Sequence, residues 1–527
     1  MKSLAAVTTV TITTALAGGV LAGSRFPQRR LSTAAEPGFT PGEALVEAQA
    51  GATTLNQTIP DHPDKLTFKP IAFEPPRPED HRVVLKNGMV VYIAEDRTLP
   101  LVNVGLTLRT GSYLEPADKA GVAALTGSQI RRGGTKSLTA EQLDERLDFL
   151  AAQVSTGIGD TAGSASLNAL ADNLDESLKI FVEMLKEPRF QEDRLALAKE
   201  QALQEMKKRN DDPADIERLE WNTLLYGEQH FTNRFTTEAS IKSISRQDLL
   251  QFHNKYFHPA NMIAAVSGSF DRPAMLRKLE AAFASWPGPK PAVPPVPSEI
   301  QTVQPGLYRI QKDVPQGRVT MGLPSVKRDN PDVYALEVMN EILGGSGFNS
   351  RIMRTVRSNE GLAYQAGSGL RFGVWYPGSF RVVFQSKSRS VPYALSLVID
   401  EIRRIREQPV TEEEIDTIKK NLIETFPSNF ASKAQAMALF ASDEYTGRDR
   451  RYWSTYRDRI RAVTAADVQR VARTHLDPTR MVILVVGNQG EIDLGDGKHE
   501  VSLSALANSK VTVLPLRDPL TMKRPGG

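Results

Sequence analysis

Residues 248–268 read DLLQFHNKYFHPANMIAAVSG, and residues 467–487 read DVQRVARTHLDPTRMVILVVG. In each stretch a helical pattern precedes a proline turn, and an apolar run follows and ends at glycine. A period of roughly 200 residues is too long for a solenoid repeat, so the two stretches indicate a duplicated domain. The positions that recur at one constant offset are Asp248/Asp467, Pro259/Pro478, Met262/Met481, Val266/Val485 and Gly268/Gly487.

Proline-rich stretches divide the chain around these copies. Residues 60–78 and residues 287–297 each hold six prolines, which neither a helix nor a central strand tolerates. The expected organisation is a signal peptide at 1–22, an extended proline-rich strap at 23–78, an N-terminal domain at 79–286, a linker at 287–304, a C-terminal domain at 305–490 and a tail at 491–527.

The beginning of the chain has the pattern of an export signal. Met1-Lys2 precedes an uncharged, weakly apolar run, and small residues around Ala22 suit a cleavage site. This pattern predicts a periplasmic protein. Residues 1–35 also contain no acidic residue and carry Arg25, Arg29 and Arg30, so an organellar transit peptide and the mitochondrial matrix remain the alternative. No later segment has the roughly 18 consecutive apolar residues of a membrane span, so none is expected.

Composition limits the chemistry. The 527 residues include no cysteine, which excludes thiol nucleophiles, disulfides and Cys-ligated metals. Only seven histidines are present, and 65 Lys+Arg against 62 Asp+Glu give a net charge of +3. Nucleic-acid binding requires a clustered excess of basic residues, so no nucleic-acid partner is expected.

Each half mixes strands and helices. Residues 82–93 read as a hairpin with an Asn87-Gly88 turn, and residues 102–109 alternate apolar and polar side chains as a half-buried strand does. A helix is predicted after Thr139, with Leu143 and Leu147 on one face, and another after Thr411, where a capping-box pattern precedes an apolar periodicity. The interleaving lacks strict βαβ order, so we expect an α+β fold with two homologous domains, each a largely antiparallel sheet packed with helices.

A series of short motifs follows the predicted hairpin and strand in a distinctive order. The motifs are Thr110-Gly-Ser112, Gly121-Val-Ala123, Gly134-Thr135, Asp211-Asp-Pro213, His258-Pro-Ala-Asn-Met262 and Arg357-Ser-Asn-Glu-Gly-Leu-Ala-Tyr364. This order resembles the insulinase/pitrilysin family of zinc metallopeptidases over about residues 79–490. The resemblance implies that the two domains form half of a clam-shell, that substrate is enclosed between two such halves, and that zinc binds in the N-terminal domain.

The sequence departs from that family at the zinc motif. Active members carry His-x-x-Glu-His after the Gly-x-Ala element, with two zinc ligands on one helix face and a general base between them. Here Ala124, Gly127 and Ser128 hold the three positions, and none supplies a zinc ligand or a base. Glu205 matches the expected third ligand, but one carboxylate makes no zinc site. No metal is therefore expected in this chain.

Arg357 and Tyr364 match the family's substrate-holding pair in the C-terminal domain. The resemblance implies that they bind the substrate carbonyl, and both side chains donate hydrogen bonds without changing protonation state. The hypothesis is a non-catalytic, substrate-binding subunit of a heterodimeric zinc metallopeptidase, inactive alone, whose homologous partner supplies the zinc site. The alternative is a structural or peptide-binding protein of the same fold with no role in proteolysis.

Overall fold

The computed structural model describes residues 62, 65, 66, 73–284, 286, 292–506 and 511–525. The chain divides into two compact units, Met1–Lys69 and Pro70–Gly527. The expected signal peptide at 1–22 and most of the strap at 23–78 lie outside the described residues. The first helix described in the second unit is the short α1 (Pro78–His81).

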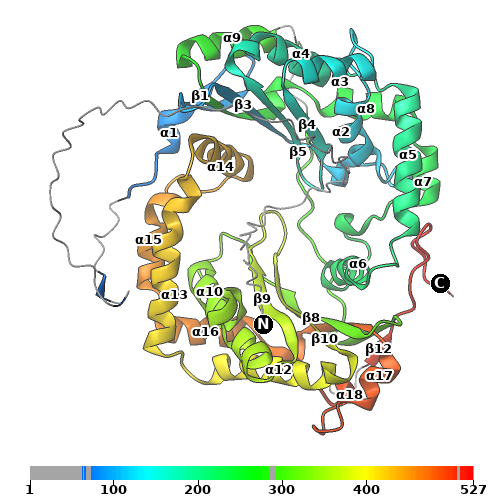
Figure 1. Cartoon of the computed structure of the whole chain (residues 1–527), viewed down its shortest axis with the longest axis vertical. Helices are drawn as coiled ribbons and strands as arrows, with labels where there is room; N and C mark the ends of the chain where they lie inside the picture. The colour runs from blue at the N-terminus through cyan, green and yellow to red at the C-terminus, as the bar shows by residue number, and fades with distance from the viewer. Residues whose placement is uncertain are drawn as a thin grey trace, which may run out of the picture. The chain divides into compact units, whose positions relative to one another are not determined.

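The N-terminal domain contains a six-stranded sheet in the order β1-β2-β6-β3-β5-β4 (Figure 1). The predicted hairpin forms its first edge, and Gly88 takes the left-handed conformation that the turn requires, with φ +84°. Neighbouring strands are antiparallel except β2 and β6, which are parallel. The strands are β1 (Arg82–Val84), β2 (Val90–Glu95), β3 (Leu101–Leu108), β4 (Gln153–Ile158), β5 (Gly163–Leu170) and β6 (Met262–Gly268).

The C-terminal domain repeats this sheet in the order β12-β7-β11-β8-β10-β9. The two strand orders correspond position by position from one edge to the other, so β9 corresponds to β4 and β11 to β6. Only the pairs β7–β11 and β7–β12 are parallel among its described strands. The duplicated α+β fold is thereby confirmed. The strands are β7 (Gly306–Gln311), β8 (Gln316–Pro324), β9 (Ala363–Arg371), β10 (Ser379–Lys387), β11 (Val482–Gly487) and β12 (Val511–Val513).

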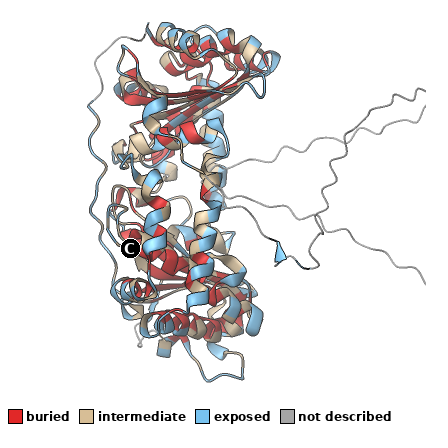
Figure 2. Ribbon diagram, turned by 90° about the vertical axis from the view of Figure 1, so that its left-hand side faces the viewer, coloured by how far each residue is buried: buried red, intermediate tan, exposed pale blue. Residues whose placement is uncertain are grey.

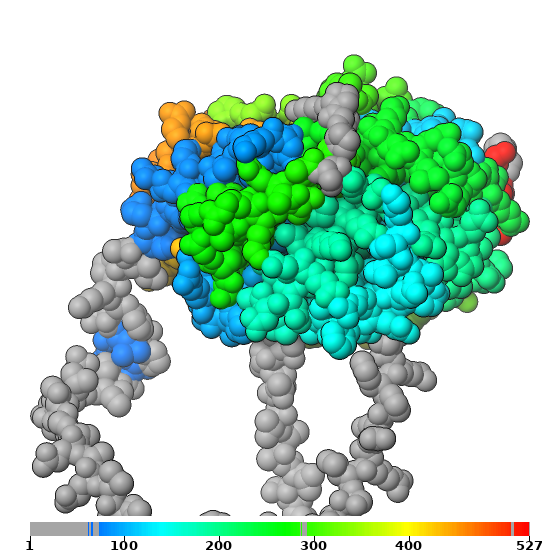
Figure 3. Space-filling view, turned by 90° about the horizontal axis from the view of Figure 1, so that it is seen from above, coloured from blue at the N-terminus to red at the C-terminus, as the bar shows by residue number. Residues whose placement is uncertain are grey.

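Amphipathic helices pack on both sheets, and buried residues are concentrated where they meet the strands (Figure 2). The two repeated stretches form the same unit, with α8 leading to β6 and α16 leading to β11. The capping box predicted at Thr411 is present, and the helix predicted after Thr139 also begins with a capping box. Helices α4 and α9 contact each other on the outer face of the N-terminal domain, where their teal and green atoms adjoin (Figure 3).

The helices of the N-terminal half are α2 (Val122–Arg132), α3 (Ala140–Phe149), α4 (Leu174–Lys186), α5 (Glu192–Lys207), α6 (Pro213–Tyr226), α7 (Glu238–Ser243), α8 (Arg246–Tyr256) and α9 (Arg272–Ala284). Those of the C-terminal half are α10 (Val333–Asn340), α11 (Arg351–Met353), α12 (Val391–Glu407), α13 (Glu412–Thr425), α14 (Lys433–Thr446), α15 (Tyr452–Ala462), α16 (Ala465–His475), α17 (Gln489–Leu494) and α18 (Leu503–Leu506). Among the described residues no helix is both long and apolar enough to cross a membrane.

Each half contributes one helix that packs on the sheet of the other half, and we call α6 and α14 the exchanged helices. Helix α14 of the C-terminal half packs on β2 and β6 of the N-terminal sheet, where Phe440 and Met437 are buried against Tyr92 and Ile263 (Figure 1). Helix α6 of the N-terminal half packs on β8 and β11 of the C-terminal sheet through an apolar cluster. This cluster comprises Ile216, Trp221, Leu224, Leu225, Tyr226, Ile310, Val482, Leu484 and Val486.

An ion pair accompanies each exchanged helix. Glu444 of α14 accepts two hydrogen bonds from Arg82 on β1, at 2.8 and 3.1 Å, and one from the Tyr92 hydroxyl at 2.9 Å. Glu217 of α6 is buried and accepts hydrogen bonds from Thr320 and from Arg318 of β8, the latter at 2.5 Å. The exchange therefore combines apolar burial with satisfied polar contacts.

The linker and tail are packed against the domains. Described residues 292–300 of the linker contain no helix or strand, and Pro294 accepts a hydrogen bond from the Tyr113 hydroxyl at 3.0 Å. The tail begins within α17, and β12 adds a strand beside β7. Farther on, Arg517 contacts Glu220 of α6 at 2.9 Å and Glu228 at 2.8 Å. The tail thus contacts elements from both halves.

Candidate functional site

The N-terminus of α2 is fixed by a buried carboxylate. Glu115 accepts hydrogen bonds from the backbone N–H of Gly121 at 3.1 Å and of Ala123 at 2.7 Å. Burial raises the pKa of Glu115, whereas these backbone donors oppose the shift. Gly121 has φ +103°, and a Cβ there would lie 2.9 Å from the Thr236 side chain, so glycine is required at this turn. The Gly121-Val-Ala123 motif therefore sets the start of the helix.

The three zinc-motif positions share one side of α2 but differ in burial. Ala124 is exposed, Ser128 is half-buried, and Gly127 is buried against the edge strand β4. The Ser128 hydroxyl donates to the Leu125 carbonyl at 3.1 Å, within its own helix. A methyl group, a hydrogen atom and one hydroxyl do not fit a zinc ion, which binds to imidazole, thiolate and carboxylate groups.

Gly127 leaves no space for a side chain. The Thr156 hydroxyl donates to the Gly127 carbonyl at 2.6 Å, so helix and strand are in direct contact. A Cβ on Gly127 would lie 2.4 Å from the backbone nitrogen of Ile158 and 2.7 Å from the carbonyl carbon of Gly157. A glutamate at this position would therefore require β4 to move.

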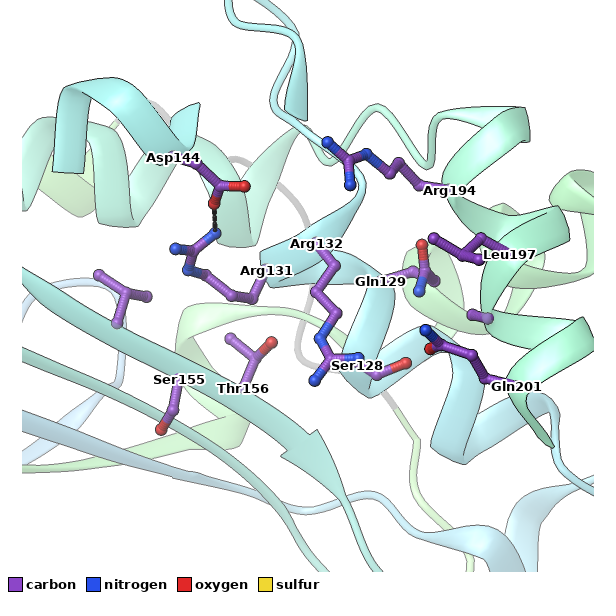
Figure 4. A pocket seen from close by; sticks show the side chains of 12 residues that line it. Ser128, Gln129, Arg131, Arg132, Asp144, Ser155, Thr156, Arg194, Leu197 and Gln201 are labelled. Carbon is purple, nitrogen blue, oxygen red and sulfur yellow. Dashed lines mark hydrogen bonds and ion pairs between the residues drawn. The ribbon is translucent and has the colours of Figure 1, made fainter. Parts of the chain in front are cut away.

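A cavity of about 620 Å³ lies beside this contact, between α2, α5 and residues 154–156 of β4 (Figure 4). Ser128 lines it, but Glu205 does not. Glu205 is 78% exposed at its side chain and lies 3.9 Å from Lys208. One turn earlier on α5, Gln201 lines the cavity in its place. Glu205 therefore does not share this cavity with Ser128, and no cluster of three metal-ligating side chains occurs within the described residues.

Arg357 and Tyr364 are brought together in the C-terminal domain. The Arg357 Cζ lies 4.8 Å from the centroid of the Tyr364 ring and 4.5 Å from that of Phe348, so two aromatic rings flank the guanidinium. Both rings are largely exposed, at 78% for Tyr364 and 66% for Phe348. No carboxylate partner of Arg357 occurs among the described residues. Its N–H groups are therefore available to a ligand.

The backbone around this pair is anchored. Residues Arg354–Asn359 form a π-helical turn, and Gly361, with φ +64°, donates its N–H to the Arg357 carbonyl at 3.0 Å. Just before it, the buried Arg351 makes two hydrogen bonds to Glu414 of α13, at 2.7 and 2.6 Å. The turn reverses the chain so that Tyr364 enters the edge strand β9 directly after it.

A second cavity, of about 660 Å³, adjoins the pair and includes Tyr364 in its lining. Gly344, Gly345 and Gly347 line it too. These glycines belong to the run Leu343-Gly-Gly-Ser-Gly-Phe-Asn-Ser350, which ends at Ser350, the N-cap of α11. The contribution of this run to the cavity and the contact of Phe348 with Arg357 were not predicted. The available signal was an aromatic residue within a run of glycines.

Comparison with known proteins identifies the fold and then the family. The crystal structure of a peptidase M16 inactive domain from Pseudomonas fluorescens is similar at a TM-score of 0.70 and 25% identity, covering 77% of this chain and 97% of that one. A protease from Helicobacter pylori gives a TM-score of 0.68 at 21% identity, covering 79% and 100%. The molecule thus has the two-domain architecture of these chains.

Sequence comparison agrees. The model described as Insulinase (Peptidase family M16) matches residues 90–234, and the model described as Peptidase M16 inactive domain matches residues 243–422. The non-peptidase homolog YmxG of Helicobacter pylori is 24% identical over 419 residues, 78% of this chain and 94% of that protein. An uncharacterized zinc protease YmxG of Bacillus subtilis is 24% identical over 54% of this chain and 68% of that protein. The chain belongs to the insulinase family, peptidase family M16.

Proposed function

We propose that this chain is a catalytically inactive member of its family and serves as the substrate-binding subunit of a heterodimeric zinc metallopeptidase that degrades or processes peptides. The observation that carries the proposal is the contrast between its two sites. The zinc-motif positions lack ligand groups, and Gly127 lacks space for one. The half-buried Arg357 and the exposed Tyr364 are in contact on an anchored turn beside a cavity.

The pair has the chemistry of a carbonyl clamp. A guanidinium and a phenol can both donate hydrogen bonds to a peptide carbonyl oxygen, and the bonds strengthen as negative charge develops on that oxygen. Neither group has to gain or lose a proton for this role. The flanking rings hold the guanidinium in place and leave its positive charge in effect, whereas a carboxylate would neutralise that charge.

The partner is proposed to be a homologous subunit with an intact His-x-x-Glu-His motif, which would bind the zinc and activate the water. The likeness to the periplasmic protease PqqL from Escherichia coli agrees with a two-part assembly at the level of the fold. The TM-score is 0.65 at 14% identity, and this chain covers 45% of that chain. This chain would thus provide one half of a chamber.

The test is to purify the full chain from its own cells and to identify stoichiometric partners and metal by mass spectrometry. Peptidase activity on an internally quenched peptide should appear only in the complex. Arg357→Ala should lower kcat of the complex about 100-fold, the effect of removing one oxyanion donor. Tyr364→Phe keeps the ring on Arg357 and tests the hydroxyl alone.

The matched control is Arg354→Ala. Arg354 lies in the same π-helical turn, but it has a carboxylate nearby, Glu414 at 3.9 Å, and its side chain is 55% exposed. This variant should retain the activity of the complex. Full activity of the Arg357→Ala complex would contradict the assignment of the clamp. A chain that purifies without any zinc-bearing partner would instead favour the structural or peptide-binding alternative.

We also propose that the mature chain acts in the periplasm after cleavage near Ala22. Cell fractionation and N-terminal sequencing of the mature protein test this location. Recovery of an uncleaved chain with the cytoplasmic fraction would contradict it.

A further inference from the structure

The cavity beside Ser128 is rich in arginine. Arg131 and Arg132 of α2 and Arg194 of α5 line it, together with one carboxylate, Asp144 (Figure 4). Arg131 pairs with Asp144 at 2.6 Å, and Arg194 pairs with Glu141 at 2.6 Å. Arg132 is exposed and has no ion pair or hydrogen bond to another described residue. The cavity therefore has an excess of positive charge.

Two further polar groups in this cavity lack partners. Gln129 is 1% exposed, and its side-chain oxygen has no hydrogen-bond partner among the described residues. The same holds for the buried Nε of Arg194. A buried polar group without a partner lowers stability, so such groups indicate a missing ligand or water. A ligand that both donates and accepts hydrogen bonds would satisfy this site.

The third wall of the cavity is the edge strand β4. Residues 154–156 line the cavity, and β4 pairs with β5 on one side only. The backbone N–H and C=O groups on the other side are the template on which an extended peptide adds a strand. Leu197, 47% exposed, adds an apolar surface on the opposite wall.

We propose that this cavity binds an extended peptide through an acidic side chain, with Arg132 as the counter-charge. The inference rests on the proposed peptide-binding function and adds the substrate class. A strand that pairs with residues 154–156 runs past the arginines and presents alternate side chains to one side. Its carboxylate would pair with the Arg132 guanidinium, and its backbone would supply the hydrogen-bond donor that the Gln129 side-chain oxygen lacks. Where active relatives place a metal cation, this chain would use an arginine cation to hold substrate.

The experiment uses the full chain without its partner and fluorescence anisotropy of a labelled host peptide of alternating Thr and Val, blocked at both ends. The central residue is Glu, Gln or Lys, and a fourth peptide has central Gln and a free C-terminal carboxylate. The wild-type chain should bind the Glu peptide about three- to tenfold more tightly than the Gln peptide, in the range of partly exposed charge pairs, and the preference should decrease with added salt.

Arg132→Gln should abolish that preference, and Arg132→Glu should reverse it in favour of the Lys peptide. Arg403→Gln is the matched control, because Arg403 is a 57% exposed arginine on α12, away from this cavity. Equal binding of the Glu and Gln peptides by the wild-type chain would overturn the inference and leave the proposed function intact. Failure to bind any peptide would count against both, and a preference for the free C-terminus alone would overturn the assignment to an acidic side chain.

Discussion

The edge strands β4 and β9 occupy the same place in the two sheets, and each is approached by a helix through a glycine. A Cβ on Gly127 would lie 2.4 Å from the backbone nitrogen of Ile158 in β4. A Cβ on Gly344 would lie 2.3 Å from the backbone nitrogen of Ser368 in β9. The close approach is thus a property of both halves, although only the N-terminal half corresponds to the zinc-bearing half of the family.

The two edges differ in how their cations are held. Beside β4, Arg132 has no described partner and lines a polar cavity with two other arginines. At the start of β9, Arg357 lies between the rings of Phe348 and Tyr364. In both halves a glycine brings a helix against an edge strand, and an arginine without a described carboxylate partner lies near that edge.

The largest expected effect comes from a substitution that disrupts the close approach of α2 to β4. Gly127→Glu would force a charged side chain against β4, so we expect a loss of about 3 kcal/mol and a Tm lower by about 6–12 °C. Gly344→Glu should behave in the same way if the two edges are equivalent. Thermal unfolding followed by circular dichroism measures both. Ser128→Ala is the control and should change Tm by no more than about 2 °C. An unchanged Tm for Gly127→Glu would contradict the packing.

A smaller effect is expected for the ion pairs of the two exchanged helices, whose removal should lower stability by different amounts. Glu217 is 7% exposed at its side chain and its removal leaves Arg318 and Thr320 without their acceptor, so Glu217→Ala should cost about 2–4 kcal/mol. Glu444 is 19% exposed, and Glu444→Ala should cost about 1–2 kcal/mol. Urea unfolding compares the two variants. A larger loss for Glu444→Ala would reverse this ranking of the exchanged helices.

The Glu444 contact also predicts a pH dependence. The hydrogen bond from Arg82 lowers the pKa of Glu444 below its ordinary value. A carboxyl group whose pKa is lower in the folded state stabilises the fold above its unfolded pKa, and this contribution is lost as pH falls through the folded pKa. The difference in Tm between the wild-type chain and Glu444→Gln should therefore be largest near neutral pH and shrink as pH falls below about 4. A difference that stays constant down to pH 3 would contradict this cause.

The sequence predicted the duplication and the local elements well, because both depend on short patterns. The Asn87-Gly88 turn, the capping boxes at Thr139 and Thr411 and the two copies of helix, turn and strand are fixed by neighbouring residues. The exchange of α6 and α14 was not predictable in this way. A periodic apolar face shows that a helix is buried, but not which sheet covers it.

The candidate sites show the same division between features set by neighbouring residues and features set by the folded chain. Arg357 and Tyr364 were paired by the resemblance to the family's motif, and because a single turn joins them the guanidinium and the Tyr364 ring are in contact. Glu205 was placed by counting across about 75 residues, and it lies one turn beyond Gln201 on the same face of α5, where its side chain is largely exposed. Gln201, one turn earlier, lies in the cavity. The steric reason for Gly127 depends on β4, which only the folded chain brings beside it.

The smallest expected effect concerns the ring that distinguishes the C-terminal edge. Phe348→Ala removes one of the two rings beside Arg357, and an exposed cation–π contact contributes about 0.5–1 kcal/mol. Peptide affinity, measured by anisotropy with the host peptide that has a central Gln, should fall about two- to fivefold. The chain offers a matched control in Phe149, which is 76% exposed and has the Arg146 Cζ 4.8 Å from its ring centroid, away from both edges. Phe149→Ala should leave peptide affinity unchanged. Equal losses in the two variants would mean that Phe348 acts no differently from any exposed ring, and the proposed difference between the two edges would then rest on Arg357 and Tyr364 alone.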